Sequence, residues 1–190
     1  MKTLIISLKI FLFFTVLTGI IYPLLVTGIV QVVFPVQANG SLVVKGGKKV
    51  GSELIGQQFN NPVYFSSRPS AVSYNPLPSG GSNYGLTSVK LKKFVDSCRA
   101  QFIAFNLLDS LTPVPPEMLF ASASGLDPHI SPEAALLQVD RISLARGFNP
   151  GQKKELARCI KELTEPPQFL CLGEERINVF LLNLATDNIR

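Results

Sequence analysis

The feature that most constrains this chain is a run of 25 residues, 10–34, without a charged side chain. As a helix rising about 1.5 Å per residue, this run is roughly 37 Å long and can cross a hydrocarbon core of about 30 Å with some tilt. Charged residues recur throughout the rest of the chain. The sequence therefore predicts a short N-terminus at residues 1–9, one transmembrane helix at residues 10–34 and a compact soluble domain at residues 35–190.

A cleaved signal peptide is the alternative interpretation of this segment. Lys2 and Lys9 would form its basic region, and Val-Gln-Ala at residues 36–38 offers small residues for cleavage. The apolar core of a signal peptide runs about 7–15 residues, however, and this run is longer, which favours a retained helix. Gly19, Pro23 and Gly28 also form a face that suits packing against other helices, although a lone helix can carry the same residues.

The charges that flank the span predict its orientation. Lys2 and Lys9 precede the span, whereas the first charged residue after it is Lys45. The positive-inside rule therefore places the N-terminus in the cytoplasm and the soluble domain outside a cell (inner) membrane. The basic residues of the domain carry little weight here, because long domains are translocated largely regardless of charge.

The overall charge gives little information about partners. The chain has 18 basic and 13 acidic residues, and the basic residues are scattered along it. The densest cluster, Lys90, Lys92 and Lys93, falls on one predicted helix and is interpreted as its solvated face. A nucleic-acid surface needs a larger basic patch, usually interleaved with aromatic residues, and the chain has no Trp. The sequence therefore predicts no nucleic-acid partner.

The three cysteines, Cys98, Cys159 and Cys171, form no CxxC pair and do not indicate a metal site. Outside the cytoplasm, Cys159 and Cys171 can form a disulfide, but cysteines are also often simply buried. The sequence leaves both states open.

The search for catalytic residues finds little. His129 is the only histidine, so a His-based metal site or a Ser-His-Asp triad has little to build on. It follows Asp127 just before a predicted helix, where we expect it to bond the backbone, with Asp127 acting as an acid or as a turn-former. Nothing selects a pair of carboxylates for acid–base catalysis. The sequence therefore predicts neither a catalytic residue nor a metal.

Turn and helix signals predict an α+β domain in which helices dominate. A short β-hairpin is expected at residues 41–50, because Gly46 and Gly47 supply the positive φ of a tight turn. Residues 60–85, rich in Pro, Ser, Asn and Gly, are expected to be an ordered loop. A helix then begins with Thr87 or Ser88 as its cap. Its apolar face is predicted from residues at helical spacing: Leu91, Phe94, Val95, Cys98, Phe102 and Phe105.

The C-terminal half is predicted to contain three further helices. Ser131 caps one that runs to Arg146, with Gly147 in the left-handed position after it. Asn149 caps the next helix and forms a capping-box-like pair with Gln152. This helix ends before the prolines at 166 and 167. The remaining expectations are short strands at residues 118–121 and 169–172, and a final helix, favoured over a strand, at residues 177–185.

A small polar loop is the one candidate for an anion site. Ser79, Gly80, Gly81, Ser82 and Asn83 precede a helix, and backbone N–H groups in such loops can wrap a phosphate. No Lys-Ser or Lys-Thr follows, so this is not a Walker motif. By residue type alone, a turn-forming loop is the alternative.

Several segments together resemble the C subunit of the bacterial high-affinity potassium-transporting P-type ATPase, the Kdp complex (KdpC family). They are residues 51–57, 64–71, 79–83 and 121–132, with Gln138, Arg141 and Arg146-Gly147 downstream, then residues 178–179 and 183–185. The resemblance covers nearly the whole chain, including the single N-terminal span. It departs at Ser66, where a Trp is common, at Gly85-Leu86, where Gly-Pro is usual, and at Cys159 and Cys171.

The resemblance implies a non-catalytic accessory subunit, needed for an assembled and active complex, beside a channel-like subunit and a P-type subunit that hydrolyses ATP. Its expected surroundings include membrane lipid. Residues 79–83 are implied as a nucleotide-contacting loop, with ATP as a ligand but no tightly bound cofactor. Structural or interface roles are implied for the other motif residues: Tyr64, Phe65, Arg68, Pro69, Ser70, Ser124, Gly125, Leu126, Asp127, Pro128, His129, Ser131, Gln138 and Arg141.

The predicted topology conflicts with the nucleotide role, because a domain outside the membrane cannot meet cytoplasmic ATP. It favours a role in assembly and near the ion entrance over a chaperone for ATP binding. A membrane-tethered extracytoplasmic binding protein and an extracytoplasmic hydrolase are the alternative functions, and the single histidine argues against the second.

Overall fold

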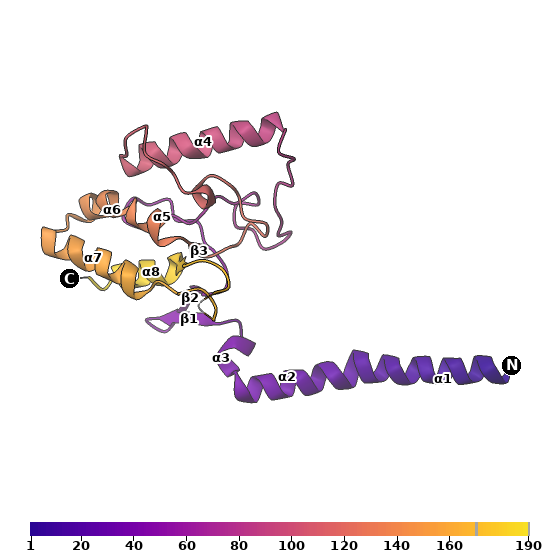
Figure 1. Ribbon diagram of the computed structural model, residues 1–190. Helices are drawn as coiled ribbons and strands as arrows, with labels where there is room; N and C mark the ends of the chain where they lie inside the picture. The colour runs from indigo at the N-terminus through magenta and orange to yellow at the C-terminus, as the bar shows by residue number, and fades with distance from the viewer. Residues whose placement is uncertain (170, 190) are drawn as a thin grey trace. The chain divides into compact units, whose positions relative to one another are not determined.

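The computed structural model describes residues 1–169 and 171–189, and the chain divides into two compact units, Met1–Ser52 and Glu53–Arg190 (Figure 1). The first unit contains the long N-terminal helix and a β-hairpin. The second contains the remaining helices and a second pair of short strands. The predicted fold class, α+β with one apolar N-terminal helix and a helix-dominated domain, is confirmed.

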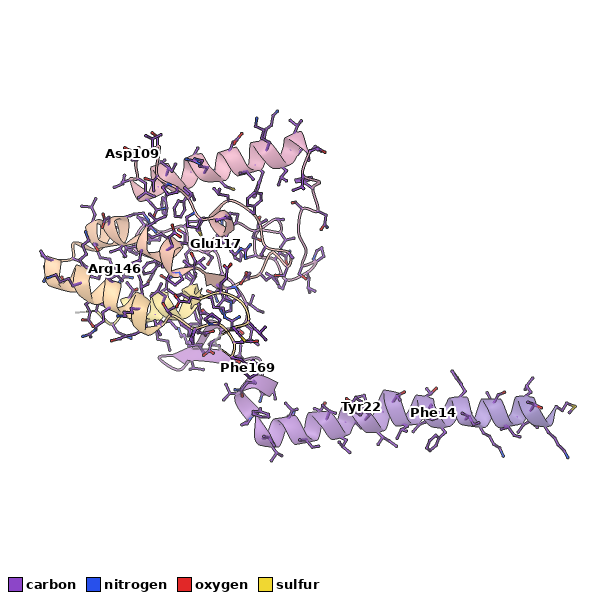
Figure 2. The ribbon with its side chains drawn as sticks, viewed as in Figure 1. Phe14, Tyr22, Asp109, Glu117, Arg146 and Phe169 are labelled. Atoms are coloured by element: carbon purple, nitrogen blue, oxygen red, sulfur yellow. The ribbon has the colours of Figure 1, made fainter. Side chains whose placement is uncertain are left out.

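The first unit is dominated by one continuous helix, Lys2–Val33, which extends eight residues N-terminal of the charge-free run. It is the one helix in the described part of the chain that is long and apolar enough to cross a membrane, and none of its apolar window is buried. Phe14 and Tyr22, for example, project from the helix into open space (Figure 2). It comprises three segments: α1 (Lys2–Val16), the π-helical turn η1 (Leu17–Ile21) and α2 (Tyr22–Val33).

The π-helical turn has a local cause. Pro23 has no N–H to donate to the preceding turn, and its ring crowds the carbonyl four residues earlier. The helix widens at η1, where the Tyr22 N–H donates to the Leu17 carbonyl. Thr15, before this turn, and Thr18, within it, donate their hydroxyls to backbone carbonyls of the same helix at 2.8 and 2.7 Å, so both polar side chains are satisfied internally.

A short helix, α3 (Pro35–Ala38), and the predicted β-hairpin complete the first unit. Strands β1 (Leu42–Lys45) and β2 (Lys48–Ser52) pair antiparallel, with an irregularity between Val43 and Val44. Gly46 and Gly47 have φ of +58° and +77°. Both turn residues thus have the left-handed backbone that a Gly-Gly pair predicts for a tight hairpin.

The second unit begins with a long ordered loop, residues 53–88, as expected for a segment rich in Pro, Ser and Gly. Short and medium elements follow it. They are α4 (Val89–Asn106), the 3-10 helix η2 (Pro116–Met118), β3 (His129–Ile130), α5 (Pro132–Leu136), α6 (Val139–Arg146), α7 (Pro150–Glu162), β4 (Ile177–Asn178) and α8 (Val179–Thr186). β3 and β4 form a two-residue antiparallel pair.

The predicted helix starts are confirmed by their side-chain caps. The Ser88 and Ser131 hydroxyls accept from the N–H groups of Leu91 and Ala134 at 3.4 and 3.1 Å. Asn149 and Gln152 form a reciprocal capping box at 2.8 and 2.9 Å. Each cap satisfies N–H groups that the first helical turn leaves without intrahelical partners.

The predicted helix over residues 131–146 is divided in two. The Gln138 N–H bonds to the carbonyl of Ala135, three residues back, and this tight turn separates α5 from α6. The Gln138 side chain donates to the Ala134 carbonyl of α5 at 3.2 Å and also contacts the loop. The C-terminal end of α6 is as predicted, with Gly147 at φ +65°.

Three expectations near the short strands need correction. Residues 118–121 are not a strand, because the N–H groups of three of them, Met118, Leu119 and Phe120, bond back to the carbonyls of Pro115 and Pro116 and form η2 with the following turn. Of the strand predicted at residues 169–172, residue 170 lies outside the described part, and Phe169 has φ +53° in a turn. The predicted last helix starts at Val179, two residues late, because Ile177 and Asn178 pair with β3.

The hydrophobic core lies among α5, α6, α7 and α8. Helix α7 contacts each of the other three, and its Leu156 and Ile160, four residues apart on one face, are almost completely buried. Ile142 of α6 and Leu182 of α8 are fully buried beside it. Helix α4 runs along another part of this unit, in contact with α6 and η2 (Figure 1).

Candidate functional site

Two buried amides hold the motif segment that contains Phe65. The Asn183 side chain accepts from the Phe65 N–H at 2.7 Å and donates to the Phe65 carbonyl at 3.0 Å. The Gln138 side chain makes the same pair with the backbone of Ser66, at 2.7 and 3.4 Å. Each amide thereby supplies the hydrogen bonds of a neighbouring strand. The amides fasten the long loop to α6 and α8, and the Phe65 ring between them is fully buried in the hydrophobic core.

Arg141 joins the loop to α4. Its side chain is 3% exposed, with Nε donating to Asn106 Oδ1 at 2.8 Å and Nη2 to Gln138 Oε1 at 3.0 Å. Nη1 donates to the Pro62 carbonyl, and the guanidinium lies 4.3 Å from the centre of the Phe105 ring. Burial lowers the pKa of Arg141 to about 10, so it remains charged at neutral pH. A buried cation is thus stabilised by carbonyl and amide oxygens and by an aromatic face.

Arg146, which is labelled in Figure 2, makes a second link between α6 and the loop. Its Nε donates to the Val63 carbonyl at 2.8 Å, and its Nη2 lies 2.9 Å from the Asp187 carboxylate. The guanidinium is 5.1 Å from the centre of the Tyr64 ring. Tyr64, one of the motif residues, therefore packs against the Arg146 guanidinium, which its bonds to Val63 and Asp187 hold in place.

Asp127 receives three hydrogen-bonding or charged groups. Arg68 Nη1 is 2.6 Å from its Oδ2, while the His129 N–H donates to its Oδ1 at 3.0 Å and His129 Nδ1 lies 3.4 Å away. Burial would raise the pKa of Asp127, but the hydrogen bonds from His129 and the charge of Arg68 outweigh burial and lower it to about 2. Asp127 is thus a turn-former, which is one of the two predicted roles. The side chain of His129 contacts this carboxylate, not the backbone as predicted.

Gly125 allows two motif segments to approach closely. It has φ +70°, and a Cβ there would lie 2.5 Å from a methyl group of Val72 and 3.0 Å from the Gly80 carbonyl. The Ser70 hydroxyl donates to the Gly125 carbonyl at 2.7 Å and accepts from the Tyr74 N–H at 3.0 Å. Any larger residue at position 125 would separate these segments.

The remaining motif residues of this region are also engaged within the fold. The Ser124 hydroxyl accepts from the Leu126 N–H, and the Leu126 carbonyl accepts from Gly56 at 2.7 Å. The Pro128 carbonyl accepts from the N–H of Val179, the first residue of α8, at 2.9 Å. The segment from Ser124 to Ser131 therefore connects the loop to the start of α5 and of α8.

The loop of residues 79–83, predicted as an anion site, packs against this segment. The Gly80 N–H donates to the Ser124 carbonyl at 2.9 Å, and a Cβ on Gly81 would lie 3.2 Å from the Ala123 carbonyl. Asn83 has φ +51°. Helix α4 starts only at Val89, so the loop is not adjacent to a helix N-terminus. Residues 79–83 form a loop without a regular turn, and nucleotide binding at these residues stays a prediction.

An open groove of about 780 Å³ lies between α4 and the part of the loop around residues 58–74. One wall consists of the motif residues Arg68, Pro69 and Ser70 with Tyr74, whose hydroxyl donates to the Arg68 carbonyl. Burial raises the pKa of Tyr74 to about 12. The other wall is from α4 and its surroundings: Phe94, Cys98, Gln101, Phe102, Ala104, Phe105 and Met118.

The sequence predicted the apolar face of α4 correctly but not its exposure. Of the six residues expected on that face, only Phe102 is buried, and Phe105 is 37% exposed. Helical spacing identifies which residues share a face, but it cannot reveal how little of that face the rest of the chain covers. The groove is the feature that sequence reasoning missed.

A second hollow, of about 540 Å³, lies on the other side of Arg68. Asp127, His129, Glu117 and Arg176 are among the residues that line it, and Arg176 pairs with Glu165 at 2.9 Å. Glu117, which is labelled in Figure 2, accepts from the Ser131 N–H at 3.2 Å. No group of three or more potential metal ligands occurs in the described residues.

The three cysteines are free, without a disulfide between Cys159 and Cys171, and none of them is fully buried. Cys98 and Cys159 are half-buried, and burial raises the pKa of both thiols. Cys171 is exposed.

Comparison with known proteins gives a consistent result over the whole chain. The family model described as "KdpC: K+-transporting ATPase, c chain" matches residues 4–188. A "Potassium-transporting ATPase KdpC subunit" from Dechloromonas aromatica is 46% identical, covering 100% of this chain and 99% of the relative. Proteins of the same name from Allorhizobium ampelinum (48%; 92% and 90% covered) and Geobacter sulfurreducens (47%; 100% and 99% covered) are equally similar. The chain therefore belongs to the KdpC family, the c chains of K+-transporting ATPases.

Proposed function

We propose that this chain is a non-catalytic accessory subunit of a potassium-transporting ATPase complex, needed for its assembly. In this proposal the helix Lys2–Val33 is inserted in the inner membrane with its N-terminus in the cytoplasm, and the soluble unit lies outside. The partners are a channel-like subunit that carries the ion and a P-type subunit that hydrolyses ATP.

The engagement of the motif side chains within the fold is the observation that carries this proposal. Gln138 and Arg141 bind the loop backbone, Arg68 binds Asp127, and Ser70 binds the segment at Gly125. Groups arranged for catalysis keep reactive atoms free in a cavity. Arg68, Ser70 and Asp127 do line the groove or the second hollow, but their polar atoms bond to other segments and build one scaffold. A scaffold with a membrane-spanning helix suits a subunit that holds other subunits in place.

A soluble unit outside the membrane cannot meet cytoplasmic ATP, and so we do not extend the proposal to a chaperone for ATP binding. Nucleotide binding at residues 79–83 is not part of this proposal. The Gly80 N–H, which would have to face a phosphate, already bonds to the Ser124 carbonyl. A domain outside the membrane is instead on the side from which imported potassium arrives. We therefore favour a position near the ion entrance.

Co-purification and protease access test the proposal together. A C-terminally tagged chain should bring down large polytopic partners from detergent-solubilised membranes, and protease added to intact spheroplasts should remove the tag. Recovery of the chain alone, stable and without partners, would favour the tethered binding protein. Cleavage only after lysis would mean that the orientation is the opposite one, with the C-terminus in the cytoplasm.

The transmembrane helix provides a further test, because an anchor needs only apolar length. Gly19, Pro23 and Thr27 are four residues apart along one face, and a Cβ added at Gly19 or Gly28 would have no neighbour within 4 Å. Replacing these three residues and Gly28 with Leu should preserve insertion, because the span becomes more apolar. We expect co-purification of the partners and potassium-limited growth to fall; parental behaviour would mean that the soluble unit alone carries recognition.

A further inference from the structure

A second small hairpin, residues 165–176, connects α7 to β4 and takes no part in the scaffold described above. At its base, Glu165 and Arg176 exchange two backbone hydrogen bonds of 2.8 and 3.1 Å, and their side chains pair at 2.9 Å. Nearer the tip, Gln168 and Leu172 exchange two further backbone hydrogen bonds, both of 2.9 Å. The hairpin is thus closed at two points along its length, and its tip is the turn that follows the second point.

The tip of this hairpin is apolar and exposed. No charged residue occurs from Pro166 to Gly173. Phe169, in the turn, is 86% exposed and Leu172 is 59% exposed, whereas Tyr84, the next most exposed aromatic residue described in the second unit, reaches 45%. Phe169 also has φ +53°, a backbone conformation that bulky residues rarely adopt. An apolar side chain in an unfavourable conformation, with most of its surface exposed, indicates a contact outside the chain.

The base of the hairpin is next to the point where the chain enters the second unit. The carbonyl of Glu53, the first residue of this unit, accepts from the Asn178 side chain at 2.7 Å. Asn178 lies two residues after Arg176 in the sequence. The end of the 165–176 hairpin and the start of the unit are therefore at most about 15 Å apart.

The connection from the long helix to this point is short. Glu53 follows Ser52, which pairs with Leu42 across the β1–β2 hairpin. Residues 34–41 separate Leu42 from the end of the helix and contain α3, so they span at most about 25 Å. Two backbone hydrogen bonds of 3.0 Å at the end of α3 form a Schellman motif, which turns the chain back and shortens the connection further. Once the helix is inserted, so short a connection keeps this point of the second unit near the membrane surface.

The charges of the hairpin argue against electrostatic attraction to anionic lipid. Glu165 and Arg176 pair with each other, so Glu174 and Glu175 leave the base with a net negative charge. Anionic headgroups would repel this base. Attraction to a membrane can therefore come only from the uncharged tip, through burial of its apolar surface.

The size of the tip distinguishes a bilayer from a protein partner. A stable protein contact buries about 800 Å² on each side, far more than the two side chains of Phe169 and Leu172 present. A unit that is already tethered to a membrane needs only weak additional binding, because the tether makes the second contact intramolecular. One aromatic and one aliphatic side chain at the end of a hairpin fit this second requirement.

We propose that the 165–176 hairpin inserts Phe169 and Leu172 into the boundary between headgroups and acyl chains of the bilayer that holds the helix Lys2–Val33. The carboxylates at its base then remain among the hydrated headgroups. The inference rests on the proposed function only for the insertion of the long helix, and it holds for either orientation of that helix. The hairpin gives the second unit an additional attachment, which restricts its rotation above the membrane.

A native cysteine places a probe in this hairpin. The variant Cys98→Ser/Cys159→Ser leaves the exposed Cys171 as the only thiol, to which an environment-sensitive NBD fluorophore is attached. The full chain is reconstituted into phosphatidylcholine vesicles whose acyl chains carry bromine at defined depths. Because bromine quenches only on contact, loss of fluorescence reports insertion and its depth.

The control probe tests a different surface of the same unit. It carries the fluorophore on Leu111→Cys in a chain without native cysteines, at a position as exposed as that of Phe169. The Leu111 N–H bonds to Asp109, and Figure 2 shows Asp109 and Phe169 at opposite ends of the second unit. Insertion driven by the fluorophore itself would be equal at both sites.

We expect bromolipids to quench the fluorophore on Cys171 and not the one at position 111. Quenching should be strongest with bromine near the start of the acyl chain, since interfacial apolar groups lie about 5–10 Å into the boundary. Phe169→Asp/Leu172→Asp should abolish it without shifting the urea midpoint, because both side chains are exposed. The control Leu111→Asp/Leu144→Asp changes two leucines more exposed than Leu172 and should leave quenching unchanged. Phosphatidylglycerol or low salt should not strengthen it.

Each other outcome contradicts the inference. Absence of quenching at Cys171 in a chain that resists carbonate extraction would mean that the helix is inserted and the hairpin stays in water. Quenching only with phosphatidylglycerol, and lost in salt, would assign the contact to headgroup charge. Shielding of Cys171 from aqueous iodide only after assembly with other subunits would assign the tip to a protein, and shielding that rises with chain density would assign it to a second copy. Release of the whole chain by carbonate would instead contradict the proposed function.

Discussion

The two units of this chain use the same apolar residue types in opposite ways. In the helix Lys2–Val33, Leu, Ile, Val and Phe side chains project outward on all sides and none of the apolar window is buried. In the unit Glu53–Arg190, residues such as Leu156 and Leu182 are fully buried and polar groups bond to each other around them. The long helix of the first unit therefore has no apolar packing of its own, whereas the second unit contains its own core.

Because of this difference, the same kind of mutation should have different effects on stability in the two units. Truncating an apolar side chain of the second unit should destabilise its fold, while the same truncation in the long helix should leave that fold unchanged. The following experiments use the full chain in detergent and measure unfolding of the soluble unit by urea.

The largest effect is expected from truncation in the α7 stripe. Leu156→Ala should lower the free energy of unfolding by about 2–5 kcal/mol, because a fully buried Leu leaves a cavity. Leu25→Ala, in the long helix where the side chain is 56% exposed, is the matched control and should have no measurable effect. Equal destabilisation by the two variants would show that the units do not unfold separately.

Removing a buried amide should have the next largest effect. Gln138→Leu leaves the Ser66 N–H and one Arg141 donor without their acceptor, at a cost of about 2–3 kcal/mol. Gln101→Leu, at an exposed position of α4, should change stability little. A parental urea midpoint for Gln138→Leu would mean that the loop is held by packing alone.

The Arg68–Asp127 pair should make stability depend on pH. Because the pKa of Asp127 is about 2 when folded and about 3.9 when unfolded, its contribution is present above about pH 5 and is lost as the pH falls through the folded value. Allowing for partial exposure, the loss is about 1–2 kcal/mol.

The control for this prediction is Asp127→Asn, which cannot ionise. The gap in unfolding free energy between parent and variant should shrink from pH 7 to pH 3, since only the parent loses a charged partner for Arg68. A gap that stays constant over this interval would show that the carboxylate contributes hydrogen bonds without a net charge effect.

The smallest effect is expected at a helix cap. Ser131→Ala removes the hydroxyl that accepts from the Ala134 N–H and should cost about 1 kcal/mol. Ser82→Ala, at an exposed loop position, provides the comparison and should be neutral. An unchanged urea midpoint for Ser131→Ala would mean that water replaces the cap without loss.

Local sequence signals predicted the parts of this protein that depend on near neighbours. The uncharged run, the Gly46-Gly47 turn and the caps at Ser88, Ser131 and Asn149 were all confirmed, because each rests on interactions within a few residues. Family membership was also recognisable, since the motif residues occur in order along the chain.

Tertiary structure decided what those residues do. Asn183 and Gln138 bond to backbone 118 and 72 residues away, and no local pattern reveals such partners. The strand expected at residues 118–121 became a 3-10 turn beside Pro115 and Pro116, and Ile177 and Asn178 joined β3 instead of the last helix. The apolar stripe of α4 was evident from its spacing, but only the packing of the whole unit determined that Phe94 and Phe105 border an open groove, because burial depends on which distant segments fold over a face.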